Sequence, residues 1–369
     1  MRYTREDGCR VWLTFGMLTP ESLAAIMDEF GSAEAVYDKF LHQGGSFLKA
    51  FRAGESSIAA LSTHADGSVL HNALVTMRDL QCGIMHIDDP EYPDSLRNIP
   101  QPPALLYYRG NLECLMGKCV AVVGSRTVSP QGEVVTRDIC RELSRSGVTI
   151  VSGLAMGADT AAHEGCIDGG SPTVAVLACG MDVDYPMENA ELKERIIRGG
   201  GLLLSEYPIG MHGSRYVFQM RNRIISGLSK ALVMMESRVR SGSMITVQHA
   251  LDQGRDVFAY PGVPGSESAE GAHQLLREGA IYFTSARDIL EDLGWADDLP
   301  AITQQQKKEL PKMTPEQHSI YALLGGGEMS FDELADKSGI PPAQLSVILT
   351  LMQISGIIRA MPGKSYCRN

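Results

Sequence analysis

The sequence predicts an α/β protein with a mostly parallel sheet, preceded by a small helical domain and followed by a winged helix-turn-helix. In the middle of the chain, short apolar runs rich in β-branched residues alternate with helical stretches, which is typical of a parallel sheet covered on both faces. Paired helix caps come before this region, and a helix-turn-helix pattern with a two-stranded wing comes after it. We expect domains at residues 1–77, 78–298 and 313–369, with a linker at 299–312.

The length and charge limit the function classes. The chain has 369 residues, 44% of them hydrophobic and 21% charged, with a formal net charge of −11. These values are ordinary for a globular protein of two or three domains. The acidic balance argues against a protein that coats nucleic acid with its whole surface, so nucleic-acid binding requires a local basic patch.

The cysteines and the apolar segments indicate the compartment. None of the eight cysteines forms a C-x-x-C pair, and most lie in apolar stretches. They therefore predict reduced core residues and no metal site. The sequence has neither a basic N-terminal region followed by a long apolar run nor a segment of about 18 apolar residues. We expect a cytoplasmic protein without membrane contact.

The first elements are short helices with recognisable ends. Thr19 and Pro20 form a cap and first-turn pair, Gly31 ends the first helix, and Ser32 caps the next. Residues 19–43 contain one Lys and no Arg. The composition therefore favours a structural or partner-contacting role over contact with a DNA backbone.

A proline-rich connector at residues 92–111 leads into the sheet. Its prolines exclude a continuous helix and predict an extended, packed segment. The predicted strands are at 119–124, 148–152, 173–178, 201–205, 231–236 and 257–260. The predicted helices between them are at 131–146, 159–167, 189–198, 218–226 and 243–253.

Glycine and serine gather where these strands end. Ligands of open parallel sheets bind beyond the carboxyl ends of the strands. Glycine there lets a ligand approach the backbone, while hydroxyls and helix-start amides bind phosphate oxygens. Neither G-x-G-x-x-G nor G-x-x-x-x-G-K-[ST] occurs at these turns, which argues against a dinucleotide or triphosphate cofactor. The predicted anion-binding rim comprises Gly124, Ser125, Arg126, Ser152, Gly153, Ser241, Gly242 and Ser243.

Residues 207–251 reverse the charge balance of the chain. Their six cations accompany a single carboxylate, Glu236, and Phe218, Tyr216 and Asn222 lie among the first arginines. Planar guanidinium groups beside aromatic rings hold phosphates and stack bases of single-stranded nucleic acid. The segment therefore predicts half of a binding groove; a solvated helix face is the alternative. The cations are Arg215, Arg221, Arg223, Lys230, Arg238 and Arg240.

The last domain follows a polar, glutamine-rich linker. Thr314 and Pro315 begin one helix, and Ser330 with Glu333 forms the capping box of a second. The third helix, at 341–355, has no Lys or Arg. Helices that read the major groove normally carry such side chains, so we favour a protein-contact role here over base reading.

Other side chains give little support to catalysis. Asp159 and His163 lie four residues apart on a helix and are compatible with a metal or acid/base pair. Local hydrogen bonding by the Asp and a satisfied His is the preferred interpretation. Glu206 and Glu236 lie at strand ends but have no nucleophile or paired carboxylate at a suitable spacing. We expect no enzyme activity, no cofactor and no metal.

The ordered motifs from Tyr92 to Ala280 resemble the DNA processing protein A family, DprA/Smf. They include VAVVGSR at 120–126, VSGLAMGADTAAH at 151–163, FQMRNRIISGLS at 218–229 and SGSMIT at 241–246. Each motif is weak alone, but the ordered series is specific. The helical domain in front, similar to SAM or HhH modules, and the winged helix behind are similar to extra domains of many members.

The resemblance implies an extended Rossmann-like domain without known catalysis. It also implies that the protein binds single-stranded DNA, forms homodimers and helps to load the RecA recombinase onto DNA during natural transformation. By motif, the DNA pocket would contain Gly124, Ser125, Arg126, Arg215, Phe218, Arg221, Asn222 and Arg223. The sequence departs from the family pattern at Gln219, Met220 and His273.

Two other functions remain open from sequence. A nucleotide or phosphoribosyl hydrolase on a similar sheet would depend on Glu206 or Glu236. A transcription regulator would bind duplex DNA through residues 313–369, but the third helix without arginine argues against it.

Overall fold

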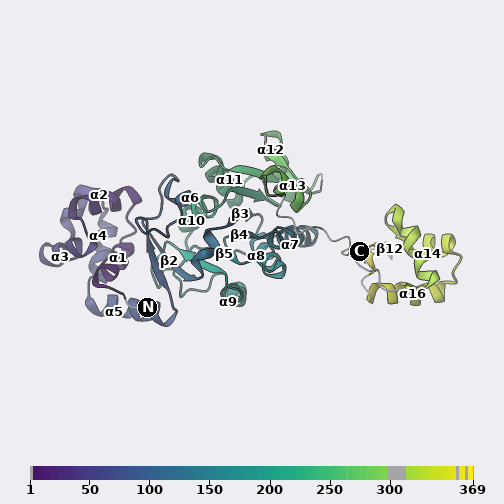
Figure 1. Cartoon of the computed structure of the whole chain (residues 1–369), viewed down its shortest axis with the longest axis horizontal. Coiled ribbons are helices and arrows are strands. Elements are labelled where there is room, and N and C mark those ends of the chain that lie inside the picture. The colour runs from purple at the N-terminus through teal and green to yellow at the C-terminus, as the bar shows by residue number, and fades with distance from the viewer. Residues whose placement is uncertain (1–2, 264, 297–312, 355–356, 362–364, 369) are drawn as a thin grey trace. The chain divides into compact units, whose positions relative to one another are not determined.

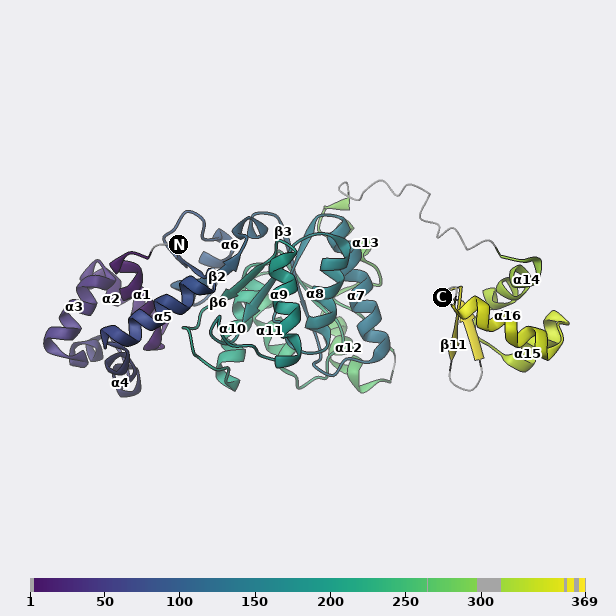
Figure 2. The same ribbon diagram turned by 90° about the horizontal axis from the view of Figure 1, so that it is seen from below.

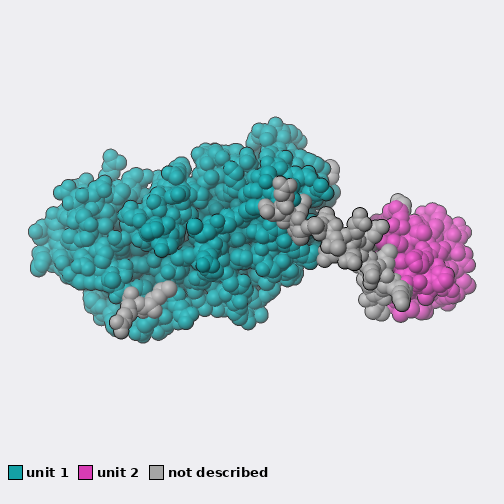
Figure 3. All heavy atoms as spheres, viewed as in Figure 1, with its two compact units in different colours: residues 1–299 teal, residues 300–369 magenta. Residues whose placement is uncertain are grey.

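The computed structural model describes residues 3–263, 265–296, 313–354, 357–361 and 365–368. The chain divides into two compact units, residues 1–299 and residues 300–369 (Figure 3). The linker predicted at 299–312 lies outside the described residues. Within the described part of the chain, no helix is both long and apolar enough to cross a membrane.

Unit 1 begins with a helical region, coloured purple to blue in Figure 1. Thr19 caps α2, Gly31 ends it in a left-handed conformation (φ 74°), and Ser32 caps α3, which confirms these three predictions. The helix α1 was not predicted from sequence. The helices are α1 (Arg5–Phe15), α2 (Pro20–Phe30), α3 (Ala33–Gln43), α4 (Glu55–His64) and α5 (Gly67–Asp79), with a 3₁₀ turn at Gly45–Phe51.

This helical region packs on the sheet as part of the same unit. Val11 of α1 and Met77 of α5 share one apolar cluster with sheet residues such as Leu203. The hydroxyls of Thr14 and Tyr107 are 2.7 Å apart. The helical region is therefore held to the sheet by buried apolar contacts and by this hydrogen bond.

A nine-stranded sheet organises the rest of unit 1. Its spatial order is β1-β2-β6-β5-β4-β3-β7-β8-β9. The ladder from β6 to β9 is parallel, whereas β2 pairs antiparallel with both β1 and β6. The strands are β1 (Gly83–His86), β2 (Leu105–Gly110), β3 (Lys118–Val123), β4 (Val148–Ser152), β5 (Thr173–Leu177), β6 (Leu202–Ser205), β7 (Ala231–Met234), β8 (Asp256–Ala259) and β9 (Ile281–Tyr282).

Helices cover both faces of this sheet. On one face α10, α11 and α12 pack on residues such as Ala121 and Val123, and on the other α7, α8 and α13 pack on Val120 and Val122. Figure 2 shows α7, α8 and α9 side by side on one face. The helices are α6 (Asp94–Arg97), α7 (Pro130–Arg145), α8 (Ala158–Gly169), α9 (Ala190–Arg198), α10 (Arg215–Gly227), α11 (Gly242–Asp252), α12 (Glu270–Arg277) and α13 (Ala286–Asp292).

The strand order changes direction at β3. From β3 the chain adds β4, β5 and β6 on one side, and it then crosses through α10 to place β7, β8 and β9 on the other side. The carboxyl ends of β3 and β7 therefore flank a topological switch point, where open parallel sheets bind ligands. Across this point the Ser125 amide donates a hydrogen bond to the Glu236 carbonyl (2.7 Å).

Unit 2 is a small helical domain with a three-stranded sheet, which confirms the predicted winged helix. The Ser330–Glu333 capping box is present at the start of its second helix. The elements are α14 (Pro315–Leu323), β10 (Met329–Ser330), α15 (Phe331–Ser338), α16 (Pro342–Ile354), β11 (Ile358–Met361) and β12 (Ser365–Arg368). The sheet order is β10-β12-β11.

The cysteines are free thiols. All except the partly exposed Cys367 are buried. Burial raises the pKa of Cys114 to about 11 and that of Cys140 well above its ordinary value, so these thiols stay protonated and unreactive at neutral pH. This confirms the prediction of reduced core cysteines.

Candidate nucleic-acid interface

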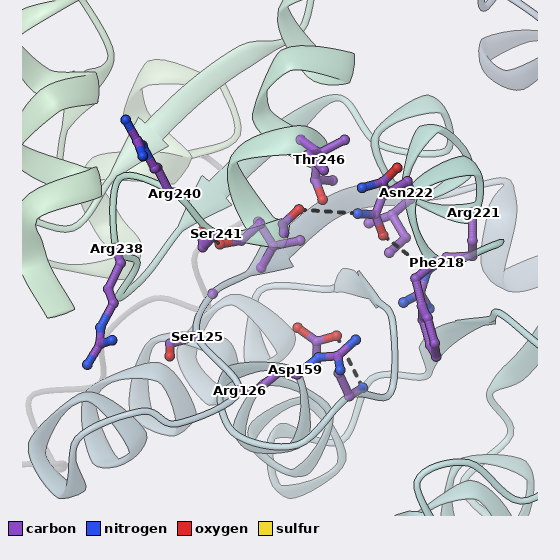
Figure 4. A pocket seen from close by; sticks show the side chains of 18 of the residues that line it. Ser125, Arg126, Asp159, Phe218, Arg221, Asn222, Arg238, Arg240, Ser241 and Thr246 are labelled. Atoms are coloured by element: carbon purple, nitrogen blue, oxygen red, sulfur yellow. Dashed lines mark hydrogen bonds between the residues drawn. The ribbon is translucent and has the colours of Figure 1, made fainter. Parts of the chain in front are cut away.

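A cavity of about 770 Å³ lies at the switch point, between the loops that follow β3 and β7 and the helix α10 (Figure 4). Ten of the thirteen predicted site residues line it. These are Gly124, Ser125, Arg126, Arg215, Phe218, Arg221, Asn222, Ser241, Gly242 and Ser243. The other lining residues are Val123, Thr127, Ala155, Asp159, Gln219, Ile225, Arg238, Arg240, Ile245 and Thr246.

Helix α10 supplies one wall of the cavity. The Ser214 hydroxyl caps it by accepting a hydrogen bond from the Val217 amide. Arg215, Phe218 and Asn222 recur at intervals of three and four residues, so they lie on one helix face. Apolar residues on other faces of α10, such as Ile224, are buried. The helix is thus anchored by its apolar side and presents a mixed cationic and aromatic side to the cavity.

Arg126 and Phe218 form a stacked pair at this wall. The guanidinium carbon of Arg126 lies 5.0 Å from the centre of the Phe218 ring. Arg126 is exposed, and it has no ion pair within the part of the chain that the structure describes. Cation–π contact orders an exposed arginine while leaving its charge available. The pair therefore offers a phosphate ligand directly beside an aromatic face.

Three further arginines line the cavity. Arg215 and Arg240 are exposed and have no acidic partner among the described residues. Arg238 forms an ion pair with Glu267 at 3.0 Å, and both side chains are exposed. Ion pairs of this kind are weak in water. In Figure 4, Arg238 and Arg240 lie at the opposite end of the cavity from Phe218.

The start of α11 adds neutral donors. Ser241 is the N-cap residue of α11, but its side chain caps none of the amides. Its hydroxyl lies instead 2.6 Å from that of Ser237 and 2.7 Å from that of Ser243, and the Ser237 and Ser243 hydroxyls are 2.9 Å apart. First-turn amides without a side-chain cap are a favourable site for an anion. The predicted helix start is therefore confirmed, together with a triangle of hydroxyls that sequence reasoning did not predict.

Arg221 lies in the floor of the cavity, with only 4% of its surface exposed. Its guanidinium donates to the carbonyls of Gly153 (2.7 Å) and Val176. Burial raises the pKa of the neighbouring Asp159 carboxyl, and the positive charge of Arg221 opposes that rise. Arg221 thus fixes the turn after β4 and supplies a positive charge beneath the cavity.

Comparison with known proteins identifies the family. A DNA recombination-mediator protein A model matches residues 83–294, and a DprA winged helix domain model matches residues 304–364. The chain is 38% identical over 284 residues to protein Smf of Escherichia coli, covering 75% of each. It is 43% identical over 204 residues to the DNA processing protein DprA of Streptococcus pneumoniae, covering 55% of this chain and 72% of that one. The chain belongs to the DprA/Smf family.

Two solved structures of this family resemble the chain. DprA from Streptococcus pneumoniae aligns with a TM-score of 0.65 and 33% identity, covering 79% of this chain and 99% of that one. DprA from Helicobacter pylori aligns with a TM-score of 0.52 and 27% identity, covering 58% and 96%. The latter structure is described as showing a unique single-stranded DNA binding mode of that protein. The family resemblance inferred from the motifs is therefore confirmed.

Three of the predicted residues do not line the cavity. Arg223 is buried, forms a bidentate ion pair with Glu206 (2.7 and 2.8 Å) and donates to the Gln101 carbonyl. The Ser152 hydroxyl is fully buried and donates to the Val122 carbonyl. Arg223, predicted in the basic groove, and Ser152, predicted in the anion-binding rim, thus contact other protein groups and lie outside the cavity.

Gly153 is the third predicted residue that does not line the cavity. Its lack of a side chain leaves space for the guanidinium of Arg221. A Cβ at position 153 would lie 2.6 to 2.7 Å from the Arg221 guanidinium. The glycine therefore makes room for a protein side chain and not for a ligand. Gly157 has a related role, because its φ of 79° and close approach to the Ser125 carbonyl exclude a side chain. Glycines in this family motif thus permit close packing of the loops beneath the cavity.

The alternative chemistry finds no support in these side chains. Asp159 accepts hydrogen bonds from the Gly153 and Ala155 amides, as the local interpretation predicted. His163 contacts the Thr173 hydroxyl through Nδ1 (2.8 Å), while Nε2 has no hydrogen-bond partner within the described residues, so it is only half satisfied. Burial lowers the pKa of His163 to about 3. No group of three or more His, Cys, Asp or Glu suited to a metal occurs in the residues described.

The two strand-end glutamates are also engaged in structural contacts. Glu236 accepts hydrogen bonds from the Ser129 amide (2.8 Å) and hydroxyl (2.5 Å) at the start of α7. Glu206 holds Arg223. Neither carboxylate lines the cavity, so the geometry gives no basis for the hydrolase alternative.

Sequence reasoning left several lining residues out of the site. Arg238 and Arg240 were noted in the basic segment, but their position just after a strand was not used, although it places them at the carboxyl edge. Thr246 follows Ser243 by three residues on α11 and could have been found from helical spacing. Asp159 was interpreted as a locally hydrogen-bonded residue, with a metal or acid/base role as the alternative, because its proximity to Arg221 is not visible in sequence.

Proposed function

We propose that the cavity binds single-stranded DNA without reading its sequence. The observation that carries this proposal is the Arg126–Phe218 pair, a guanidinium without an acidic partner in the described residues, stacked beside a ring that lines the cavity. Arginines supply counterion release and phosphate contacts, and an aromatic ring is worth about 1–3 kcal/mol per stacked base. The single-stranded DNA binding described for the Helicobacter pylori relative supports the same ligand.

The position of each side chain decides which part of the DNA we propose that it contacts. Arg126, Arg215 and Arg240 contact phosphates, and Phe218 stacks a base. The uncapped amides at the start of α11 take a further phosphate oxygen. Arg221 acts from below by holding the loops and by its positive charge, and it does not act as a free phosphate ligand. Stacking and phosphate contacts are tolerant of sequence because every base has a π face.

We further propose a role for this binding in recombination. Family membership supports a protein that forms a homodimer in the cytoplasm, protects incoming single strands and loads the RecA recombinase onto them during natural transformation. In this proposal the protein acts by binding and not by catalysis, since the candidate carboxylates Glu206 and Glu236 hold other protein groups.

Fluorescence anisotropy tests the DNA-binding proposal. The full chain is titrated with labelled oligothymidine and with a matching duplex over a salt series. We expect preference for the single strand and a log–log salt slope of about −0.7 per phosphate neutralised. An Arg126→Ala/Arg215→Ala variant should bind more weakly and show a shallower slope.

A matched control removes two arginines at the other edge of the sheet. Arg145 and Arg198 are exposed and end α7 and α9, at the amino edge of the parallel strands. An Arg145→Ala/Arg198→Ala variant lowers the net charge equally and should bind as the unaltered protein does. The proposed groove would be contradicted if the two variants lost equal affinity for the single strand. It would also be contradicted if the unaltered protein bound single strands and duplex equally well.

The proposed RecA loading and the proposed homodimer are tested by separate measurements. RecA is added to single strands already covered by a competing single-strand-binding protein, and its DNA-dependent ATP hydrolysis is followed. Our proposal predicts a shorter lag with the unaltered protein and not with Arg126→Ala/Arg215→Ala. Analytical ultracentrifugation of the free protein then tests the homodimer.

A further inference from the structure

The loop after β5 places an aromatic side chain against the wall of the cavity. The ring of Tyr185 lies 5.2 Å from the ring of Phe218, with an interplanar angle of 46°. Tyr185 is 45% exposed and does not line the cavity itself. Met187, two residues on, is 71% exposed. The exposed Tyr185 ring thus continues the aromatic surface of Phe218 outside the cavity.

Packing alone does not explain this ring. Phe218 packs against a small apolar cluster of Ala178, Tyr207 and Val217, to which Tyr185 does not belong. The Tyr185 hydroxyl has no hydrogen-bond partner among the residues the structure describes. Tyr185 therefore contributes little to the core, while its ring is available on a surface next to a cationic site.

The loop that carries Tyr185 is held firmly. Lys193 of α9 is buried, and its Nζ donates to the carbonyls of Met181 (2.9 Å) and Val183 (3.0 Å) and to Oδ1 of Asp184 (2.9 Å). The Asp182 carboxylate accepts a hydrogen bond from the Gly210 amide (2.8 Å). A ring on a loop fixed in this way loses little freedom when a ligand stacks on it.

We propose that Tyr185 is a second base-stacking site, which takes the nucleobase next to the one on Phe218 as the strand leaves the cavity. The ligand class is single-stranded nucleic acid, since an unpaired base presents a flat apolar face to an exposed ring. This inference rests on the proposed function and extends its site by one nucleotide. Lys193 is the positioning residue for this site because it fixes the loop before Tyr185.

The test compares binding of oligothymidines that lengthen by one nucleotide at a time. For the unaltered protein, affinity should rise in a further step once the strand reaches Tyr185. Tyr185→Ala should remove that step, weakening binding of long strands by about tenfold and leaving the shortest bound strand unaffected. Tyr185→Phe should behave as the unaltered protein, because stacking needs the ring and not the hydroxyl.

Tyr282→Ala is the matched control. Tyr282 is 59% exposed on β9, the edge strand of the sheet, and it does not line the cavity. Its removal should change no affinity. Tyr185→Trp provides an independent signal, since stacking of a base should quench the fluorescence of the new indole when a long strand binds and not when the shortest one does.

The outcomes separate the two proposals. If no strand binds the unaltered protein, the proposed function fails, and this inference fails with it. If strands bind but Tyr185→Ala keeps the full length dependence, or the Tyr185→Trp indole is not quenched, only the second stacking site is overturned.

Discussion

Helices α10 and α16 each have 13 residues, and each lies in a fold position where nucleic-acid contact is expected. Helix α10 carries three arginines, two buried and one exposed, beside a cavity. Helix α16, the third helix of a winged domain, has no charged residue and exposes Val347 and Leu351. The difference shows that the fold supplies a position, whereas the side chains decide whether that position can hold a phosphate.

Within α10, Arg223 differs from Arg215 because it is buried and forms an ion pair with Glu206. Arg223→Ala leaves the Glu206 carboxylate without its bidentate partner. We expect the free energy of unfolding to fall by about 3 kcal/mol, because the change removes a buried side chain and its bond to the Gln101 carbonyl and leaves the partly buried Glu206 carboxylate without its partner. Urea denaturation followed by circular dichroism measures this. Arg126→Ala, on an exposed residue, should change that free energy by no more than about 0.5 kcal/mol, and equal losses would contradict the separation of roles.

The aromatic wall gives the next largest effect. Phe218→Ala removes the stacking face and the support of the Arg126 guanidinium. Affinity for oligothymidine should fall by about 1–3 kcal/mol, as anisotropy would show. Tyr216→Ala is the control on the same helix, because Tyr216 is exposed but does not line this cavity. If Tyr216→Ala lost more affinity than Phe218→Ala, the strand would bind the face of α10 that lies outside the cavity, and our proposal would be contradicted.

A smaller effect is expected at the Arg238 end of the cavity. Glu267 neutralises one lining arginine. Glu267→Gln should free that guanidinium and strengthen binding by up to about fivefold at low salt, with the gain shrinking as salt rises, because exposed pairs contribute about 0.2–1 kcal/mol. Weaker binding in this variant would show that Arg238 needs its partner for positioning.

The smallest effect is expected on α16. Val347→Asp adds a negative charge to an exposed position of the third winged helix. Single-strand affinity of the full chain should stay within about twofold of the unaltered value, because α16 has no charged residue with which to hold a phosphate. A loss of severalfold in the same titration would place α16 against the strand and reverse the contrast with α10.

Local signals predicted much of the fold. The caps Thr19, Ser32 and Ser330 and the stop at Gly31 act on the nearest amides and carbonyls, so sequence alone fixes those helix ends within a residue. Strands β1 and β2 were missed because their only signal is antiparallel pairing with each other and with β6, which is distant in sequence. Strand β2 lies within the segment 92–111, which its prolines led us to predict as an extended connector.

The site was predicted less completely for a geometric reason. Residues two apart on a helix point about 200° apart, so Arg221 and Arg223 cannot share a surface. Helical spacing from Arg215 and Phe218 leads to Asn222, and it excludes Arg223. The burial of Arg221 beside Asp159 depends on the turn after β4, which sequence spacing does not show.

The hydroxyl triangle of Ser237, Ser241 and Ser243 has a consequence for phosphate binding at the start of α11. Each hydroxyl can donate or accept, so the sense of donation around the triangle can reverse by rotation of O–H bonds alone. Such rotation takes picoseconds to nanoseconds and moves no backbone. In the proposed function, a Ser241 or Ser243 hydroxyl that turns its proton toward a phosphate at the start of α11 leaves the other two hydroxyls hydrogen-bonded to each other, so a donor is presented there without any movement of the backbone.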